Sequence, residues 1–114
     1  MKMKYFISGA ISKYNTSDEQ RKVCSDMFYN AEFDLLTLQK ASEVFNPMRL
    51  TDEFGWDREY NFYMDKCLEA LKEVDVVYFL DGWQGSNGAR LEYETAKSLN
   101  KKIEFQTCMG IWSK

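Results

Sequence analysis

The sequence of 114 residues contains no histidine, so any catalytic role falls to other side chains. Histidine triads, histidine general bases and histidine-based metallohydrolase motifs are therefore excluded. The remaining candidates concentrate between positions 81 and 92, which read Asp-Gly-Trp-Gln-Gly-Ser-Asn-Gly-Ala-Arg-Leu-Glu. This stretch has a carboxylate at each end with a hydroxyl and glycines between them. Such a composition suits either an anion-binding loop or a site that works through carboxylates.

Glu92 follows Gly88 by four residues. In a helix that begins near Ala89, this spacing puts Glu92 one turn in, where its side chain can point back over the glycine loop. The alternative is that Glu92 only provides a favourable negative charge near the helix N-terminus. Spacing alone leaves both interpretations open.

Ser86 and Gly88 stand directly before this helix. A hydroxyl and free backbone N–H groups ahead of a helix suit an anion, and Arg90 can add positive charge. The alternative is an ordinary glycine turn with Ser86 as the N-cap. Asp81 is likewise either a site carboxylate at the end of a strand or a turn-forming residue before Gly82.

The elements that must position these residues alternate between strand and helix. Strands are predicted at 5–7, 43–45, 76–80 and 102–107, and helices at 17–39, from about 57 to 74, and at 89–99. Asn46 to Trp56 is predicted to be a region of turns. This order predicts one α/β domain spanning residues 1–114, with a doubly wound, mostly parallel sheet of the flavodoxin or Rossmann type. Ligands of such sheets bind beyond the carboxyl ends of the strands, where both Ser8-Gly9 and the loop 82–88 fall.

Apolar side chains recur at helical spacing in each predicted helix and are expected to face the core. The inward sets are Val23, Met27, Ala31, Leu35 and Leu38; Tyr60, Met64, Cys67, Leu68 and Leu71; and Leu91, Ala96 and Leu99.

Three groups of residues occur in order along nearly the whole chain and carry a resemblance. They are Tyr5-Phe6-Ile7-Ser8-Gly9-Ala10-Ile11, Phe45-Asn46-Pro47, and Gly82-Trp83 leading to Ser86-Asn87-Gly88-Ala89-Arg90-Leu91-Glu92. Together they resemble a family of small bacterial and phage proteins within the nucleoside 2-deoxyribosyltransferase-like superfamily, which also contains nucleotide N-glycosidases. The last group is the most specific.

The resemblance implies that Glu92 is the nucleophile that attacks the anomeric carbon of a nucleoside or nucleotide and expels the base. It implies that Ser86 and Gly88 hold a 5′-phosphate, and that Ser8, Gly9 and Ile11 complete the pocket from the first loop. Trp83, Trp56 and Tyr14 can stack on a base, although aromatic residues are abundant here and core or surface packing is the alternative.

One position departs from the superfamily pattern. Its better-known members carry an aspartate eight residues before the aspartate that opens the central strand, and counting back from Asp75 gives Cys67. That aspartate helps to position the sugar and to protonate the departing base. Asp65 lies on roughly the opposite helix face and cannot simply replace it. Asp81 is a candidate replacement, and Cys67 is expected to line the site as a small apolar residue.

The net charge of −3 provides no basic footprint for a nucleic-acid polymer or an anionic membrane. No stretch approaches the length of a membrane span, and the three cysteines are typical of reduced thiols, so a cytoplasmic protein is expected. No metal or organic cofactor is expected, because glycosidic cleavage needs only carboxylates and water. A homo-oligomer, most simply a dimer, is expected from the resemblance and from the apolar tail Cys108, Met109, Ile111 and Trp112.

Two main functions follow. The first is an N-glycosidase or 2-deoxyribosyltransferase-like enzyme acting through Glu92, and the alternative is a non-catalytic protein that binds or sequesters a nucleotide in the same pocket. An open pocket with Glu92 and a second carboxylate about 5 to 10 Å away would favour catalysis. An open pocket with Glu92 alone would favour binding, and a closed loop around Ser86 would favour a pure interaction protein.

Overall fold

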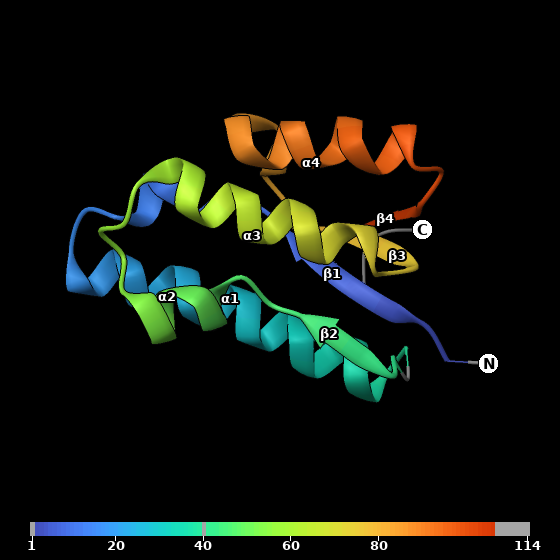
Figure 1. Cartoon of the computed structure of the whole chain (residues 1–114). Coiled ribbons are helices and arrows are strands. Elements are labelled where there is room, and N and C mark those ends of the chain that lie inside the picture. The colour runs from blue at the N-terminus through green and yellow to red at the C-terminus, as the bar shows by residue number, and fades with distance from the viewer. Residues whose placement is uncertain (1, 40, 107–114) are drawn as a thin grey trace.

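A computed structural model describes residues 2–39 and 41–106 and contains one four-stranded parallel sheet (Figure 1). The strands are β1 (Lys4–Ser8), β2 (Glu43–Phe45), β3 (Val76–Phe79) and β4 (Lys102–Phe105). The helices are α1 (Asp18–Thr37), α2 (Met48–Phe54), α3 (Tyr60–Lys72) and α4 (Asn87–Ser98), with short 3₁₀ turns at Ser12–Tyr14 and Trp83–Gly85. The strand order is β2-β1-β3-β4, and all three pairings are parallel. The predicted doubly wound α/β fold of the flavodoxin type is therefore confirmed.

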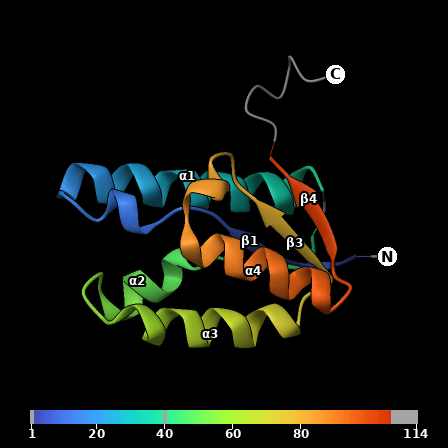
Figure 2. The same cartoon turned by 90° about the horizontal axis from the view of Figure 1, so that it is seen from above.

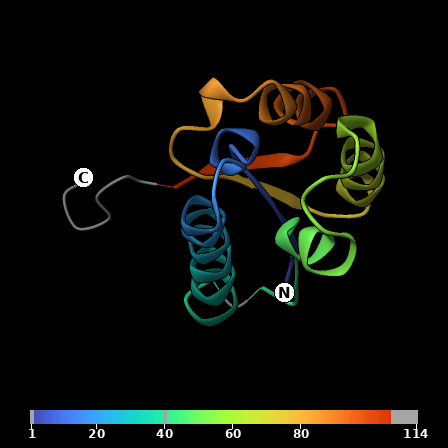
Figure 3. The same cartoon turned by 90° about the vertical axis from the view of Figure 1, so that its left-hand side faces the viewer.

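Helices cover both faces of the sheet (Figures 2 and 3). Along β1 and β3, alternate residues enter two separate cores. Tyr5, Ile7 and Val76 pack with buried residues of α1, while Phe6, Val77 and Phe79 pack with residues of α3 and α4. This explains why β1 and β3 are almost continuously apolar, since both of their faces are covered.

The inward face of α1 agrees with the prediction at Ala31 and Leu35 and differs toward both ends of the helix. Its buried residues are Cys24, Phe28, Ala31 and Leu35, whereas Val23 is 43% exposed and Leu38 is 74% exposed. The first four predicted positions were spaced by fours, and each step of four turns the position 40° further around a helix. The observed spacing of four, three and four stays on one face.

The same geometry applies to the other long helices. Ala89, Glu92 and Ala96 face inward on α4, and Met64, Cys67 and Leu71 on α3. Leu91, Leu99 and Tyr60 were expected inside but are 44%, 43% and 50% exposed. Glu92 therefore lies on the inward face of α4, whereas the two leucines that were predicted to face inward do not.

The region predicted as turns, from Asn46 to Trp56, contains helix α2. The side-chain Oδ1 of Asn46 accepts a hydrogen bond from the Met48 backbone N–H at 2.9 Å, and Gly55 ends the helix with a φ of 87°. Proline just before a helix and glycine just after it are typical of helix boundaries, and that signal was present in the sequence. Helix α3 accordingly begins at Tyr60 rather than near Asp57, after the extended residue Glu59.

The remaining boundaries lie close to the predictions. Ser17 caps α1 by accepting from the Gln20 N–H at 3.1 Å, as expected. Helix α4 starts at Asn87 rather than Ala89, because Ser86 caps it. Across residues 2–39 and 41–106, none of the helices has the length and apolarity needed to cross a membrane.

Candidate functional site

A cavity of about 280 Å³ opens at the carboxyl end of β1. The loop after β1 and the first turns of α4 line it from one side, and α2 and α3 from the other. Helix α4 follows β3, so the cavity lies between segments that leave neighbouring strands of the sheet. This is where the strand order reverses and where doubly wound proteins bind ligands. The lining residues are Ser8, Gly9, Ile11, Ser12, Asn15, Pro47, Leu50, Thr51, Trp56, Arg58, Tyr60, Tyr63, Met64, Cys67, Ser86, Gly88, Ala89 and Glu92.

Glu92 lies on the wall of this cavity and is only 6% exposed. The Ser8 hydroxyl donates a 2.5 Å hydrogen bond to its Oε1, and the Cys67 thiol donates a second one. Burial raises the pKa of Glu92 to about 7, and the two hydrogen bonds act in the opposite direction. At neutral pH this carboxyl group is therefore poised between its two protonation states.

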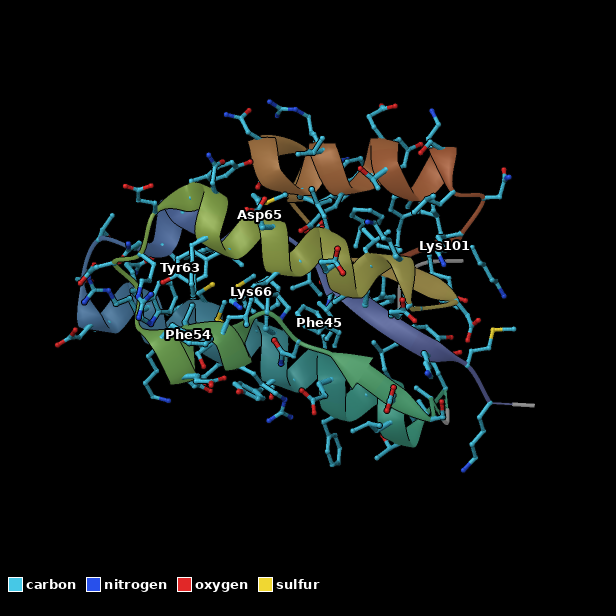
Figure 4. The ribbon with its side chains drawn as sticks, viewed as in Figure 1. Phe45, Phe54, Tyr63, Asp65, Lys66 and Lys101 are labelled. Carbon is cyan, nitrogen blue, oxygen red and sulfur yellow. The ribbon has the colours of Figure 1, made fainter. Side chains whose placement is uncertain are left out.

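The contact between Glu92 and Cys67 follows from two helix faces. Cys67 belongs to the buried face of α3, and Glu92 to the buried face of α4. Asp65, labelled on α3 in Figure 4, is exposed and does not line the cavity. The expectation that Asp65 cannot take the place of residue 67 agrees with this arrangement. Burial, reinforced by the neighbouring Glu92, raises the pKa of the Cys67 thiol well above its ordinary value.

Ser86 and Gly88 reach the cavity from the N-terminus of α4. The Ser86 Oγ accepts a hydrogen bond from the Ala89 N–H at 3.1 Å, which is the N-cap role considered from the sequence. The backbone N–H groups of Asn87 and Gly88 belong to the first helical turn, where no preceding carbonyl of the helix can receive them. The cap and these unpaired helical N–H groups thus lie side by side at the N-terminus of α4.

Two glycines allow close packing around the site. A Cβ on Gly9 would lie 3.1 Å from the Leu80 Cβ and 3.2 Å from the Phe28 ring. A Cβ on Gly88 would lie 3.2 Å from the Met64 Sδ and 3.4 Å from the Tyr60 hydroxyl. Gly9 thus lets the end of β1 approach the neighbouring strand, and Gly88 lets α4 approach α3.

Three of the predicted site residues do not line the cavity. Asp81 is exposed, and its backbone N–H donates to the Gln106 side chain at 3.0 Å. Trp83 packs against Phe79, Tyr93 and Phe105, with ring centroids 4.9 to 5.9 Å away. The loop after β3 folds toward β4 and away from the cavity, which explains both positions.

Arg90 is the third residue outside the cavity. It is exposed, and its guanidinium donates to the Gln84 carbonyl oxygen at 2.5 Å and to the side chain of Asn87. Of the two remaining aromatic candidates for base stacking, Trp56 lines the cavity, whereas Tyr14 packs against the core on the α1 side. The structure therefore brings together Glu92, Cys67, Ser8, Gly9, Ile11, Ser86 and Gly88, and leaves Asp81, Trp83 and Arg90 elsewhere.

The wall formed by α2, the loop after it and the start of α3 was not predicted from the sequence. Arg58, Tyr60 and Tyr63 line the cavity there, and Arg58 is the only cationic side chain among the described lining residues. Its guanidinium stacks on the rings of Phe54 and Phe62. Figure 4 labels Phe54 on α2 and Tyr63 on α3, where the two helices meet. Pro47 and Gly55 were the signal in the sequence. From these two residues α2 could have been predicted, and with it this wall of the cavity.

Two expectations remain untested. Over residues 2–39 and 41–106, no group of three or more cysteine, aspartate or glutamate side chains is arranged to hold a metal ion. The absence of a cofactor stays a prediction. The apolar tail at 108–112, which motivated the predicted dimer, lies outside the described residues.

Fold and cavity together define a flavodoxin-like α/β domain with one buried carboxylate at the carboxyl edge of its sheet. The chain belongs to the family described as a domain of unknown function, DUF4406, whose model matches residues 3–105. No curated protein matches the chain.

Proposed function

We propose that the cavity binds a nucleotide and that Glu92 cleaves its N-glycosidic bond. The observation that carries this proposal is the burial of Glu92 in the cavity wall, with its carboxylate held between the Ser8 hydroxyl and the Cys67 thiol. A carboxylate fixed in this way matches the demand of retaining glycoside cleavage, in which a nucleophile must meet an oxocarbenium-like transition state at C1′.

The proposed ligand is a nucleoside 5′-monophosphate. Its phosphate would lie against the N-terminus of α4, at Ser86 and Gly88, and Arg58 is the only cationic side chain among the described lining residues. Trp56 and Tyr60 would flank the base. These assignments replace Arg90 by Arg58 and Trp83 by Trp56, in accordance with the residues that line the cavity.

Glu92 would act in its ionised form. The carboxylate oxygen attacks C1′, the C1′–N bond breaks, and water then hydrolyses the glycosyl ester. Because burial raises the pKa of Glu92 to about 7, only about half of the molecules carry the reactive carboxylate at pH 7. The rate of cleavage should rise with pH through this value.

A second candidate is nucleotide binding without catalysis. It is favoured by a specific observation: Glu92 is the only carboxylic acid among the described residues that line the cavity. Retaining glycosidases use a pair of carboxylates about 5 Å apart, with the second one serving as the general acid. An open cavity whose described lining residues include no carboxylic acid besides Glu92 is the arrangement expected for binding without catalysis.

Release of free base separates the two candidates. The purified protein should be incubated with a panel of nucleosides and nucleotides, and free base should be detected by chromatography. Cleavage by the wild type and its loss in Glu92→Gln support the enzyme, because the amide keeps the shape but forms no glycosyl ester. Binding of a nucleotide with no release of base from any compound supports the binder.

A further inference from the structure

The two side chains that donate hydrogen bonds to the carboxylate of Glu92 are both neutral. Ser8 donates from the end of β1, and Cys67 donates from α3. The alcohol of Ser8 is a very weak acid, and burial further weakens the acidity of the Cys67 thiol. Neither group can give up a proton readily at neutral pH. Asp81, the carboxylate considered as a replacement, lies outside the cavity.

This arrangement matters for the departing base. When the C1′–N bond of an ordinary nucleotide breaks, the base leaves with an extra electron pair and needs a proton. General acid catalysis of that kind contributes about 10²- to 10⁴-fold in rate. A base that carries a positive charge in its glycosidic ring takes up the electron pair and leaves as a neutral molecule, without any proton.

The charges and surfaces of the cavity fit such a ligand. Glu92 supplies a negative charge beside the sugar position, and Arg58 supplies a positive charge at an exposed position of the lining. Trp56, Tyr60 and Tyr63 offer aromatic surface, which attracts cationic rings. A nucleoside 5′-monophosphate with a cationic base carries a phosphate that suits Arg58 and a positively charged ring that suits both Glu92 and the aromatic surface.

We propose that the cavity selects nucleoside 5′-monophosphates whose base is cationic, a pyridinium or an N7-alkylated purine, and cleaves them through Glu92 without a second carboxylic acid. This inference rests on the proposed function and names its substrate class. In the first step the Glu92 oxygen bonds to C1′, and the electrons of the C1′–N bond neutralise the ring nitrogen. In the second step water hydrolyses the ester, which returns the carboxylate and releases the sugar phosphate and one proton.

The test uses pairs of closely related substrates in which one base is cationic and the other is neutral. Nicotinamide mononucleotide is compared with its reduced, neutral form, and 7-methylguanosine 5′-monophosphate with guanosine 5′-monophosphate. Free base is quantified by chromatography against blanks without protein. We expect the cationic member of each pair to be cleaved at least ~100-fold faster than its partner, relative to the blanks, because the neutral base lacks general acid help. Glu92→Gln should abolish cleavage of both.

The variant Cys67→Asp tests whether the lack of an acid beside Glu92 causes the preference for cationic bases. It places a second carboxyl group beside Glu92, and two carboxylates in one site keep one of them protonated. Cleavage of the neutral nucleotides should therefore rise, and the ratio between the members of each pair should fall at least tenfold. Cys67→Ser is the matched control, because it adds no acid and should keep the ratio.

Two results would overturn the inference, and they differ from each other. Equal cleavage of charged and neutral members by the wild type would refute the selectivity while leaving the Glu92 glycosidase in place. No release of base from any of the four compounds would refute both the selectivity and the proposed function.

Discussion

Ser8 and Glu92 are 84 positions apart in the sequence and are joined by a 2.5 Å hydrogen bond inside the cavity. Ser8 ends β1, and Glu92 lies one turn into α4, so the bond connects the central sheet to the helix that follows the glycine loop. It ties the candidate nucleophile to the end of a central strand. A site built in this way holds its carboxylate in one orientation before a ligand arrives.

Ser8→Ala should raise the pKa of Glu92 further, because the serine hydroxyl donates to the ionised form and its loss leaves burial less opposed. The midpoint of Glu92 titration, followed by carbon NMR of labelled glutamate, should move above the wild-type value near 7. Ser8→Thr, which keeps the hydroxyl, is the control. An unchanged midpoint in Ser8→Ala would show that the hydrogen bond has no electrostatic role.

Glu92→Gln should change how folding stability depends on pH. The folded-state pKa of Glu92, about 7, lies above its ordinary value of 4.5, so the folded protein holds this proton more tightly than the unfolded chain. Its contribution to stability is fully present below pH 4.5 and is lost as pH rises through about 7. The wild type should therefore lose roughly 3 kcal/mol relative to Glu92→Gln between pH 4.5 and pH 8.

Urea unfolding at a series of pH values measures this difference directly. The comparison with the glutamine variant cancels the titration of the other carboxyl groups, which both proteins share. Parallel stability curves for the two proteins across this range would contradict the buried, proton-binding state of Glu92.

Arg58→Ala should weaken binding of nucleoside monophosphates by about tenfold or more, because a hydrogen bond to a charged group contributes about 1.5 to 3 kcal/mol. Binding of the corresponding nucleosides should change little. Arg90→Ala is the matched control, since Arg90 is exposed and its guanidinium is directed to Gln84 and Asn87. Calorimetric titration in a Glu92→Gln background keeps the ligand intact. A stronger effect from Arg90 than from Arg58 would restore the assignment made from the sequence.

Gly88→Ala should reduce nucleotide affinity. The added Cβ would crowd Met64 and Tyr60, at 3.2 and 3.4 Å, and would stand where a phosphate approaches the helix N-terminus. Alanine is the better helix former, which offsets part of the cost of this crowding. Gly85→Ala is the control, because nothing lies within 4 Å of its Cβ. We expect about a tenfold loss of affinity for Gly88→Ala, and equal affinities for the two variants would argue against a phosphate at this loop.

The four strands and the three long helices could be predicted from the sequence because strands and helix caps are local signals. The apolar run before Asp81 and the Ser17 cap each led to an element that the structure contains. The inward faces of the helices were less accessible. A stripe spaced by fours and one spaced by fours and threes both look amphipathic over a few turns, and only packing against the sheet decides between them.

The candidate site was predictable where neighbouring residues share one loop. Ser86, Gly88 and Glu92 are close in sequence, and all three line the cavity. Asp81 and Trp83 belong to the same stretch, but the path of the loop toward β4 removes them from the cavity, and no local signal encodes that path. Arg90 lies on the exposed face of α4. Arg58 was missed because it lies in the loop after α2, and this helix was not recognised in the sequence.

The central claim, that Glu92 attacks C1′ of a nucleotide, is tested most directly by trapping the glycosyl-enzyme. The wild type and Glu92→Gln are incubated with 2-fluoro-2-deoxy nucleotides, including one with a cationic base, and the intact proteins and their peptides are analysed by mass spectrometry. The account predicts that the wild type gains the mass of one sugar phosphate on the peptide containing Glu92, with release of one base, and that the variant gains none. Tight nucleotide binding by both proteins, with no adduct and no free base from any compound, would contradict it and leave a nucleotide-binding protein.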